Sequence, residues 1–304
     1  MTDRKVWLAF FLLAIAWGTS FLFIKIAVQT LPPLTVVAAR LLIGSTGLLL
    51  IMRWQGMSLP RTRSTWLDLI VVGVVNVGIP FMLIVWAESG EQGLDSGVAS
   101  VLNSTVPLFS IIIAAVLLRM ETVTGGKVLG LLIGFAGVVL LLSRDTVEQA
   151  SSFLPYAAMV MAAICYAAGT VYARRRLHGI QPVILATGQL IVAATLVTFL
   201  ALLVDDFNLQ AFTPTTILAL VWLGLLGSCI AYILYFFILQ EWGATRTLLV
   251  TYVVPVVGVT AGVLFLDERV DWRLFVGALM ILSGVGLVNL RRPRRKVAAE
   301  QVSS

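Results

Sequence analysis

Long apolar stretches separated by short polar loops run through almost the whole of this chain. Ten of these stretches follow one another from Val6 to Leu290, and a helix needs roughly 20 apolar residues to cross a bilayer. Breaks at Pro, Gly and charged residues predict helices over residues 6–28, 33–52, 66–87, 95–118, 127–143, 154–174, 181–204, 214–239, 246–266 and 273–290. The pattern predicts an all-α polytopic membrane protein with ten transmembrane helices, because open strand edges in lipid would leave backbone groups unpaired.

The composition leaves no room for a soluble domain, since the mean hydropathy is +1.01 and only 12% of the residues are charged. Both cysteines, Cys165 and Cys229, fall inside predicted helices at a spacing that fits no metal site. The first apolar run extends to Ile24, longer than the core of a signal peptide, and predicts an uncleaved first helix.

The basic residues are sorted between alternate loops. Of the 21 Lys and Arg residues, sixteen border one set of loops and three border the other, while Lys25 and Arg40 fall inside predicted helices. The positive-inside rule predicts that the richer set of loops faces the cytoplasm, together with both termini. The formal net charge of +6 comes from short clusters next to helices, which suit anionic lipid headgroups rather than nucleic acid.

An internal repeat organises the chain, because a shift of about 147 to 150 residues aligns two halves of five predicted helices each. The matched pairs are Trp17 with Tyr166, Lys25 with Arg174, Pro33 with Pro182, Arg40 with Gln189, Pro107 with Pro255, Glu121 with Glu268, Gly130 with Gly277 and Gly137 with Gly284. The expected units are a five-helix repeat over residues 1–146, a second over 147–290 and a basic cytoplasmic tail over 291–304. An odd number of helices inverts the second copy, and inverted repeats let a transporter open one site alternately to either side.

Three groups of residues carry a family resemblance. They are Ala16-Trp17-Gly18-Thr19-Ser20-Phe21, Asn103-Ser104-Thr105-Val106-Pro107-Leu108, and Tyr252-Val253-Val254-Pro255-Val256 with the later Leu266-Asp267-Glu268-Arg269. On these residues the chain resembles an EamA-type transporter of the drug/metabolite transporter superfamily. The resemblance implies a ten-helix carrier of the bacterial inner membrane, often an exporter of amino acids, metabolites or toxic compounds. It also implies that helices 1–4 and 6–9 surround a central cavity, with helices 5 and 10 peripheral.

Polar and aromatic residues inside predicted helices are the candidates for substrate contact, because polar groups in lipid usually face protein or a water-filled cavity. The first helix offers Trp17, Ser20 and Phe21 beside Gly18, for which packing by small residues is the alternative. The further candidates are Asn76, Phe81, Asn103, Tyr166, Tyr232, Tyr235 and Tyr252. The rings suit amphipathic or aromatic substrates, with lipid-facing rings as the alternative, while Tyr172 lies near an interface and is expected to be a belt anchor.

Three prolines inside predicted helices are expected to kink them. Pro80 lies mid-span near Asn76, and Pro107 and Pro255 occupy matched positions of the two halves. A proline frees a backbone carbonyl that a neighbour, a water or a ligand must satisfy. Kinks at equivalent points fit the discontinuous helices of transporter sites, although prolines also occur as simple bends.

Two basic residues and one acid are set apart from the loops. Lys25 lies near the outer end of its helix, where its stem is expected to snorkel to the headgroups. Arg40 lies about 10 Å inside its helix at 1.5 Å per residue. It either pairs with Glu88 or another outer acid, or offers a bidentate fork to a substrate carboxylate or phosphate. Because the single histidine, His178, is in a loop, Glu88 is the candidate for coupling to protons, with facilitated diffusion or exchange as the alternative.

These features predict a secondary transporter that exports small metabolites, such as amino acids or amphipathic and aromatic compounds, by alternating access. A nucleotide-sugar or sugar-phosphate exchanger of the same superfamily is one alternative, and a membrane receptor or scaffold is another. No enzyme, catalytic residue, metal or cofactor is expected, because the sequence has no paired His-Glu motif, Ser/His/Asp set or P-loop. The small-residue stripe of Gly126, Gly130 and Gly134 serves packing within the molecule or a dimer seam, so a monomer or a homodimer is expected.

Overall fold

The structure is a computed structural model that describes residues 3–117, 124–143, 153–206 and 208–289. These residues form helices joined by turns and loops, without a strand among them. Glu121 and the predicted tail over residues 291–304 lie outside the described part of the chain. The expected all-α fold is confirmed.

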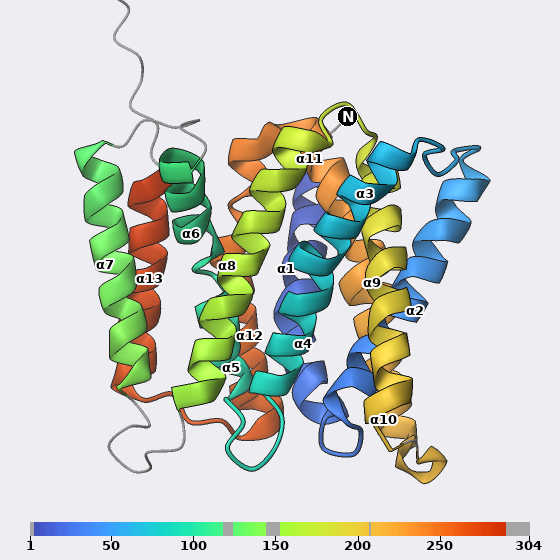
Figure 1. Ribbon diagram of the computed structural model, residues 1–304. Coiled ribbons are helices and arrows are strands. Elements are labelled where there is room, and N and C mark those ends of the chain that lie inside the picture. Colours follow the sequence, from blue (N-terminus) through green and yellow to red (C-terminus); the bar gives the residue numbers. More distant parts are fainter. Residues whose placement is uncertain (1–2, 118–123, 144–152, 207, 290–304) are drawn as a thin grey trace, which may run out of the picture.

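Ten apolar segments cross the bundle one after another (Figure 1). Seven of them are single helices: α1 (Asp3–Ala27), α2 (Pro33–Trp54), α7 (Gly125–Leu142), α8 (Phe153–Arg176), α9 (Pro182–Val204), α12 (Val250–Leu266) and α13 (Trp272–Asn289). The other three are composite: α3, η1 and α4 (Arg63–Val72, Gly73–Gly78, Ile79–Ala87), α5, α6 and η2 (Ser96–Asn103, Val106–Ile112, Ile113–Leu117), and α10, η4 and α11 (Pro214–Val221, Trp222–Ile230, Ala231–Thr247). A short 3-10 helix, η3 (Leu209–Ala211), precedes α10.

The lengths of these segments suit a bilayer. Within the described ranges, nine are long and apolar enough to cross a membrane, and α12 is slightly shorter at 17 residues. The predicted boundaries agree with the helices to within four residues, except at the end of α11. That helix was expected to end at residue 239. In α11 the helical backbone is interrupted at Gly243, whose φ of 74° suits a residue without a Cβ, and a further short helical stretch runs to Thr247.

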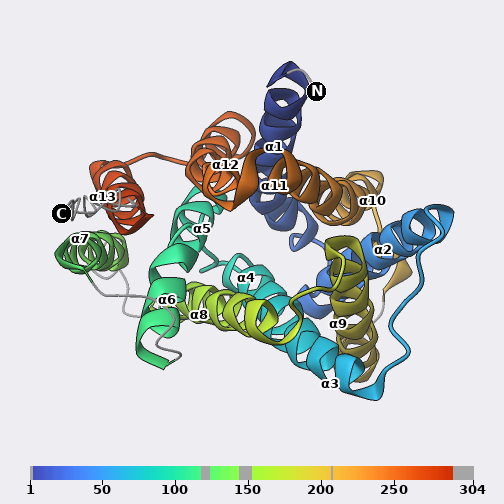
Figure 2. The same cartoon turned by 90° about the horizontal axis from the view of Figure 1, so that it is seen from above.

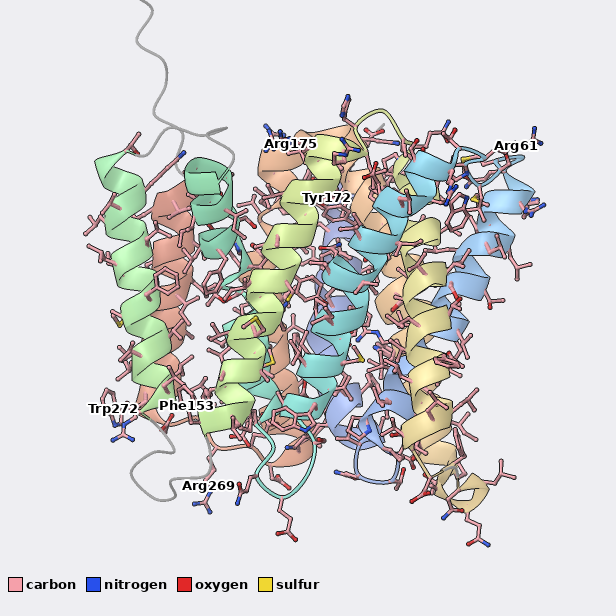
Figure 3. The ribbon with its side chains drawn as sticks, viewed as in Figure 1. Arg61, Phe153, Tyr172, Arg175, Arg269 and Trp272 are labelled. Carbon is pink, nitrogen blue, oxygen red and sulfur yellow. The ribbon has the colours of Figure 1, made fainter. Side chains whose placement is uncertain are left out.

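Basic side chains gather at one end of the bundle. Arg61 and Arg175 lie at this end, on the same side as the N-terminus, whereas Arg269 and Trp272 lie at the opposite end (Figure 3). We call the first the basic end. We call the second the acidic end, because its loops contain Glu88, Glu91, Asp95, Asp205, Asp206, Asp267, Glu268 and Asp271.

The helices α7 and α13 lie side by side at the edge of the bundle (Figure 2), as expected for the fifth and tenth helices. A Cβ on Gly130 would lie 2.7 Å from the carbonyl oxygen of Gly284, and one on Gly137 would lie 2.8 Å from that of Gly277. The sequence match pairs Gly130 with Gly277 and Gly137 with Gly284, so the two contacts are copies related by the repeat. Glycines of the predicted stripe thus allow close packing inside the molecule.

The third and eighth segments each contain a π-helix, η1 and η4, at corresponding places. A Cβ on Gly73 of η1 would lie 2.9 Å from the carbonyl oxygen of Gln189, and one on Gly224 of η4 would lie 3.1 Å from that of Arg40. Since Arg40 and Gln189 are a matched pair, the packing of η1 on α9 repeats the packing of η4 on α2. π-helical turns are frequent at functional sites.

The prolines act differently from one another. Pro80 begins α4 directly after η1, and Pro107 begins α6 after a turn at Ser104 and Thr105. Near the start of a helix, as at Pro107, a proline removes no hydrogen bond that the helix would make. Pro80 instead lies where η1 runs into α4 with helical dihedrals at Gly78 and Ile79. By contrast, α12 runs without interruption through Pro255. The fourth segment thus has a turn beside its proline, whereas the ninth is an unbroken helix at its proline, and equivalent kinks at Pro107 and Pro255 stay a prediction.

Candidate functional site

Arg40 is a buried cation in the middle of α2, with 6% of its surface exposed. Its Nε donates a hydrogen bond of 3.1 Å to Ser228 Oγ in η4, and its Cζ lies 4.1 Å from the ring centroid of Phe81 in α4. No described residue accepts a hydrogen bond from the two terminal nitrogens of Arg40. Both carboxylate oxygens of Glu88 lack a hydrogen-bond partner among the described residues, so the alternative in which Glu88 pairs with Arg40 is not seen in the structure.

A chain of hydrogen bonds runs from Gln189, the residue matched with Arg40, across four helical segments. Gln189 Nε2 donates to Tyr232 Oη in α11 at 3.3 Å, and Gln189 Oε1 accepts from Asn76 Nδ2 in η1 at 3.3 Å. Asn76 Oδ1 in turn accepts from Thr170 Oγ1 in α8 at 3.2 Å. The chain satisfies the amide of Gln189, which is buried, and the partly exposed amide of Asn76.

The two repeats build related half-sites with different chemistry. In the first, the Arg40 cation lies against the ring of Phe81; in the second, the neutral amide of Gln189 bonds the phenol of Tyr232. Both aromatic residues follow the π-helix of their own repeat. The pseudo-symmetry axis thus relates a cationic half to an uncharged one.

The two repeats also differ in which helix carries a polar side chain and which carries the glycine that faces it. A Cβ on Gly227 of η4 would lie 2.7 Å from Ser20 Oγ in α1, while a Cβ on Gly169 of α8 would overlap Asn76 of η1. The shift that matches Trp17 with Tyr166 also matches Ser20 with Gly169. The polar side chain comes from the first helix of a repeat at one interface and from the third segment at the other, with glycine opposite it each time.

Aromatic rings pack between helices around these half-sites. Trp17 lies 5.7 Å from Tyr235, and Phe81 lies 6.4 Å from Tyr166, between ring centroids. Tyr232 stacks on a neighbouring ring of its own helix at 6.0 Å. The four residues other than Phe81 keep partial exposure although they lie mid-span and meet other helices. The structure therefore brings these predicted residues together, and their rings face protein neighbours rather than lipid alone.

Some of the predicted site residues lie elsewhere. The nearest atom to a Cβ built on Gly286 of α13 is Tyr252 Oη, at 3.8 Å, so Tyr252 faces the peripheral helix rather than Arg40. Phe21 is 5% exposed and packs in the core, and a Cβ on Gly18 would lie 2.6 Å from Val257 of α12. Asn103 ends α5, and its Oδ1 is buried without a partner among the described residues.

Three residues of this cluster were not predicted as site residues: Thr170, Gln189 and Ser228. The sequence offered one indication that Gln189 belongs to the site, because the repeat alignment matches it with Arg40. The sequence offered no such indication for Ser228 and Thr170, since a lone hydroxyl in a membrane helix can donate its hydrogen bond to a backbone carbonyl of the same helix. Ser228 indeed donates to Leu223 O at 3.0 Å while it accepts from Arg40.

At the acidic end, Lys25 is bound inside the protein. Its Nζ donates to the backbone carbonyl oxygens of Glu88, Gly93 and Leu94 at 3.1, 3.0 and 2.9 Å. The three hydrogens of the ammonium group are therefore satisfied by the loop between α4 and α5. The expectation that Lys25 snorkels to the headgroups is wrong, because these carbonyls offer a nearer set of acceptors.

Glu88 is the first residue after the span Arg63–Ala87 and has no exposed surface. No described residue donates a hydrogen bond to either of its carboxylate oxygens. Burial raises the pKa of the Glu88 carboxyl well above its ordinary value, and the charges of Lys25 and Arg40 only partly oppose this. Glu88, the candidate for coupling to protons, therefore lies in closed protein at the acidic end.

Carboxylates hold helix ends together on both faces of the bundle. Glu268 accepts from the backbone nitrogens of Ser96 and Gly97 at 2.6 and 2.9 Å, where α5 begins and unsatisfied N–H groups favour an anion. At the basic end, Asp68 Oδ1 accepts from Tyr172 Oη at 2.6 Å and from Arg176 Nε at 3.3 Å. Tyr172 thus donates a hydrogen bond to an acid of the protein, and its role as a belt anchor stays a prediction.

A profile of the EamA-like transporter family matches residues 4–143 and again residues 154–290. The chain belongs to the EamA-like transporter family. It is therefore a polytopic membrane transporter of the drug/metabolite transporter superfamily, and the resemblance drawn from its motifs is confirmed. The two matches of the EamA profile cover the same five segments in each half that the repeat aligns.

Known relatives match this EamA protein over more than nine tenths of its length. An uncharacterized transporter of Archaeoglobus fulgidus is 27% identical, with 95% of this chain and 100% of the relative covered. The uncharacterized inner membrane transporter YedA of Escherichia coli is 29% identical over 96% of this chain and 94% of its own length. A probable amino-acid metabolite efflux pump of Escherichia coli is 24% identical, covering 93% and 94%.

The fold is also seen in solved structures, among them a crystal structure of a protein. It is 20% identical to this chain and matches it with a TM-score of 0.67, over 94% of this chain and 98% of the other. At this identity the likeness concerns the arrangement of the helices alone.

Proposed function

We propose that this EamA transporter is a secondary carrier that exports small carboxylate-containing metabolites, with amino acids bearing apolar or aromatic side chains as the principal class. The observation that carries the proposal is Arg40: a buried guanidinium, fixed at Nε by Ser228 and on its face by Phe81, with no described acceptor on its terminal nitrogens. Two parallel N–H groups match the two oxygens of a carboxylate.

The surroundings of Arg40 support an amphipathic substrate. The rings of Tyr166 and Tyr235 offer apolar surface with hydroxyl groups, and Gln189 offers an amide on the other side of the axis. Ligand sites combine such apolar walls with a few fixed polar groups. A substrate with a carboxylate and an apolar side chain uses both parts of this lining.

We take the two repeats, over residues 1–146 and 147–290, as the units that move against each other in alternating access. Contacts of Lys25 and Glu268 close the acidic end, whereas Thr170, one turn beyond Tyr166 toward the basic end, is exposed. The contacts of Lys25 and Glu268 support a conformation closed at the acidic end.

We assign the basic end to the cytoplasm by the positive-inside rule, with both termini on that side. Residence in the inner membrane and export of amino acids are supported by the two Escherichia coli relatives, of which one is named an inner membrane transporter and the other a probable amino-acid metabolite efflux pump.

Transport by purified protein in liposomes tests the proposal. Radiolabelled amino acids are offered to proteoliposomes loaded with the same unlabelled compound, with empty liposomes as the background. We expect saturable uptake of one or more amino acids, lost in Arg40→Ala and kept in Arg53→Ala, which removes an exposed arginine from the same helix.

Two results would overturn the proposal in different ways. If a folded Arg40→Ala variant transports an amino acid as well as the parent, Arg40 does not bind the carboxylate. If no amino acid is transported but a sugar phosphate or nucleotide sugar is, the alternative exchanger of the same superfamily is correct. Transport of none of these classes would show that the substrate of this transporter belongs to another chemical class.

A further inference from the structure

Glu88 is a carboxyl group enclosed at the acidic end without a hydrogen-bond donor. Its side chain is 0% exposed, and both of its oxygens lack a partner within the described part of the chain. An ionised carboxylate in this place has lost its water and gained no hydrogen bond in return. The neutral acid is the favoured form there, and the raised pKa of Glu88 agrees with this geometry.

The charged groups around Glu88 come from three elements: Lys25 of α1, Arg40 of α2 and Glu268 of the loop after α12. The hydrogens of Lys25 are used on backbone carbonyls, and Arg40 is turned toward Ser228 and Phe81. Glu268 adds a second negative charge, which disfavours ionisation of Glu88.

The other elements packed against α4 add no charge near Glu88. The helical segment η1 has no titratable residue. Before its terminal arginines, α8 contributes only groups that are neutral at physiological pH: Tyr156, Cys165, Tyr166 and Tyr172. No described neighbour is therefore placed to hold Glu88 as an anion by an ion pair.

Glu88 also lies between the two contacts that close the acidic end. On one side its own backbone carbonyl binds Lys25, and on the other Glu268 binds the first residues of α5. A movement that opens this end must separate these groups, and water then reaches the Glu88 carboxyl. In water a carboxyl group is ionised at neutral pH.

We propose that Glu88 is a proton-binding site, and that closing the acidic end of the carrier binds one proton at this carboxyl group while opening it releases the proton. The inference rests on the alternating access of the proposed function. Because the closed state holds one more proton, closure is favoured as the pH falls and is lost as the pH rises through the raised pKa. Between the ordinary and the raised pKa, the closed-to-open ratio falls about tenfold per pH unit.

Infrared difference spectroscopy of the purified protein tests the proton directly, without any substrate. A neutral carboxyl group without hydrogen bonds gives a distinct carbonyl-stretch band. We expect this band in the parent protein, its loss on raising the pH, and its absence from Glu88→Gln. The matched control is Glu91→Gln, which removes an exposed acid of the same loop and should keep the band.

The link between the proton and the closed end is measured by spin-label distances across it. The labels replace Gln92 and Val270, which are exposed on the two loops concerned, in a protein whose two native cysteines are replaced. We expect short distances at low pH and a growing long component as the pH rises. In Glu88→Gln the short distances should persist at every pH.

The outcomes separate this proposal from the proposed function. A band that survives Glu88→Gln, or a pH response that this variant retains, overturns the proton site whatever the protein transports. Failure of every transport assay, with the band and the distance response present, overturns the substrate class alone. A variant that does not fold is replaced by Glu88→Asp, which keeps the titrating group and should keep both signals.

Discussion

Arg40 Nε donates a hydrogen bond of 3.1 Å to Ser228 Oγ, and this bond joins the second segment of the first repeat to the eighth segment of the chain. The same guanidinium lies against Phe81 of its own repeat. These two contacts hold the plane of Arg40 and leave its terminal nitrogens for another partner. Arg40 thus links two helices through its Nε, and the proposed function assigns its two terminal nitrogens to the carboxylate of the substrate.

We expect Arg40→Lys to reduce transport by roughly 10- to 100-fold while the protein still folds. Lysine keeps the charge but loses the planar fork, and a hydrogen bond to a charged group contributes about 1.5–3 kcal/mol. The measurement is the transport rate against substrate concentration in proteoliposomes. Equal rates for the variant and the parent protein would mean that charge alone suffices and that the fork is not used.

Lys25→Ala is expected to loosen the acidic end, because it removes three hydrogen bonds between α1 and the loop after α4. The readout is modification of Val98→Cys by a membrane-impermeant thiol reagent, since Val98 is only 1% exposed in the closed state. Faster modification is expected in Lys25→Ala than in Lys5→Ala, which removes an exposed lysine from the other end of α1. Equal rates in the two variants would show that Lys25 does not hold this end closed.

Gly130→Leu is expected to destabilise the protein, because its side chain would meet the carbonyl of Gly284. Overpacking of this kind typically costs about 1–3 kcal/mol, and a lower thermal unfolding temperature in detergent measures it. Gly126→Leu is the control on the same helix, since nothing lies within 4 Å of a Cβ there. A stable Gly130→Leu protein with a changed monomer–dimer ratio would instead support the dimer seam.

Tyr172→Phe is expected to lower stability by about 1–3 kcal/mol, because the buried Asp68 loses a hydrogen bond of 2.6 Å and keeps only Arg176. Thermal unfolding of the two proteins provides the comparison. Tyr252→Phe serves as the control, since its hydroxyl bonds no residue that the structure describes. A loss of the same size in both variants would point to the ring environment rather than to the bond with Asp68.

Much of the fold could be read from the sequence. Each span is predicted by roughly 20 successive apolar residues. This property is local, so it can be recognised without knowing which other parts of the chain the span contacts. The internal repeat added the relation between the two halves, which local hydrophobicity does not give. Matching Gly130 with Gly277 and Arg40 with Gln189 implied an inverted pair of five-helix units. The contacts between α7 and α13, and those of η1 and η4, follow this pairing.

The partners of individual side chains were decided only by the tertiary structure. In a membrane helix both the lipid face and the protein face are apolar, so the sequence pattern does not tell which side of a helix faces its neighbours. The sequence therefore predicted that Tyr252 contacts the substrate, although it faces α13. It also predicted that Lys25 reaches the headgroups, although three backbone carbonyls of a distant loop bind it. Arg40 meets Ser228 across 188 residues of sequence, and only the packing of α2 on η4 brings them within bonding distance. The sequence thus determined the number, length and inverted order of the spans, because hydrophobicity and repetition are written along the chain. The folded structure decided which polar groups meet, because that depends on how the helices rotate and cross when they pack.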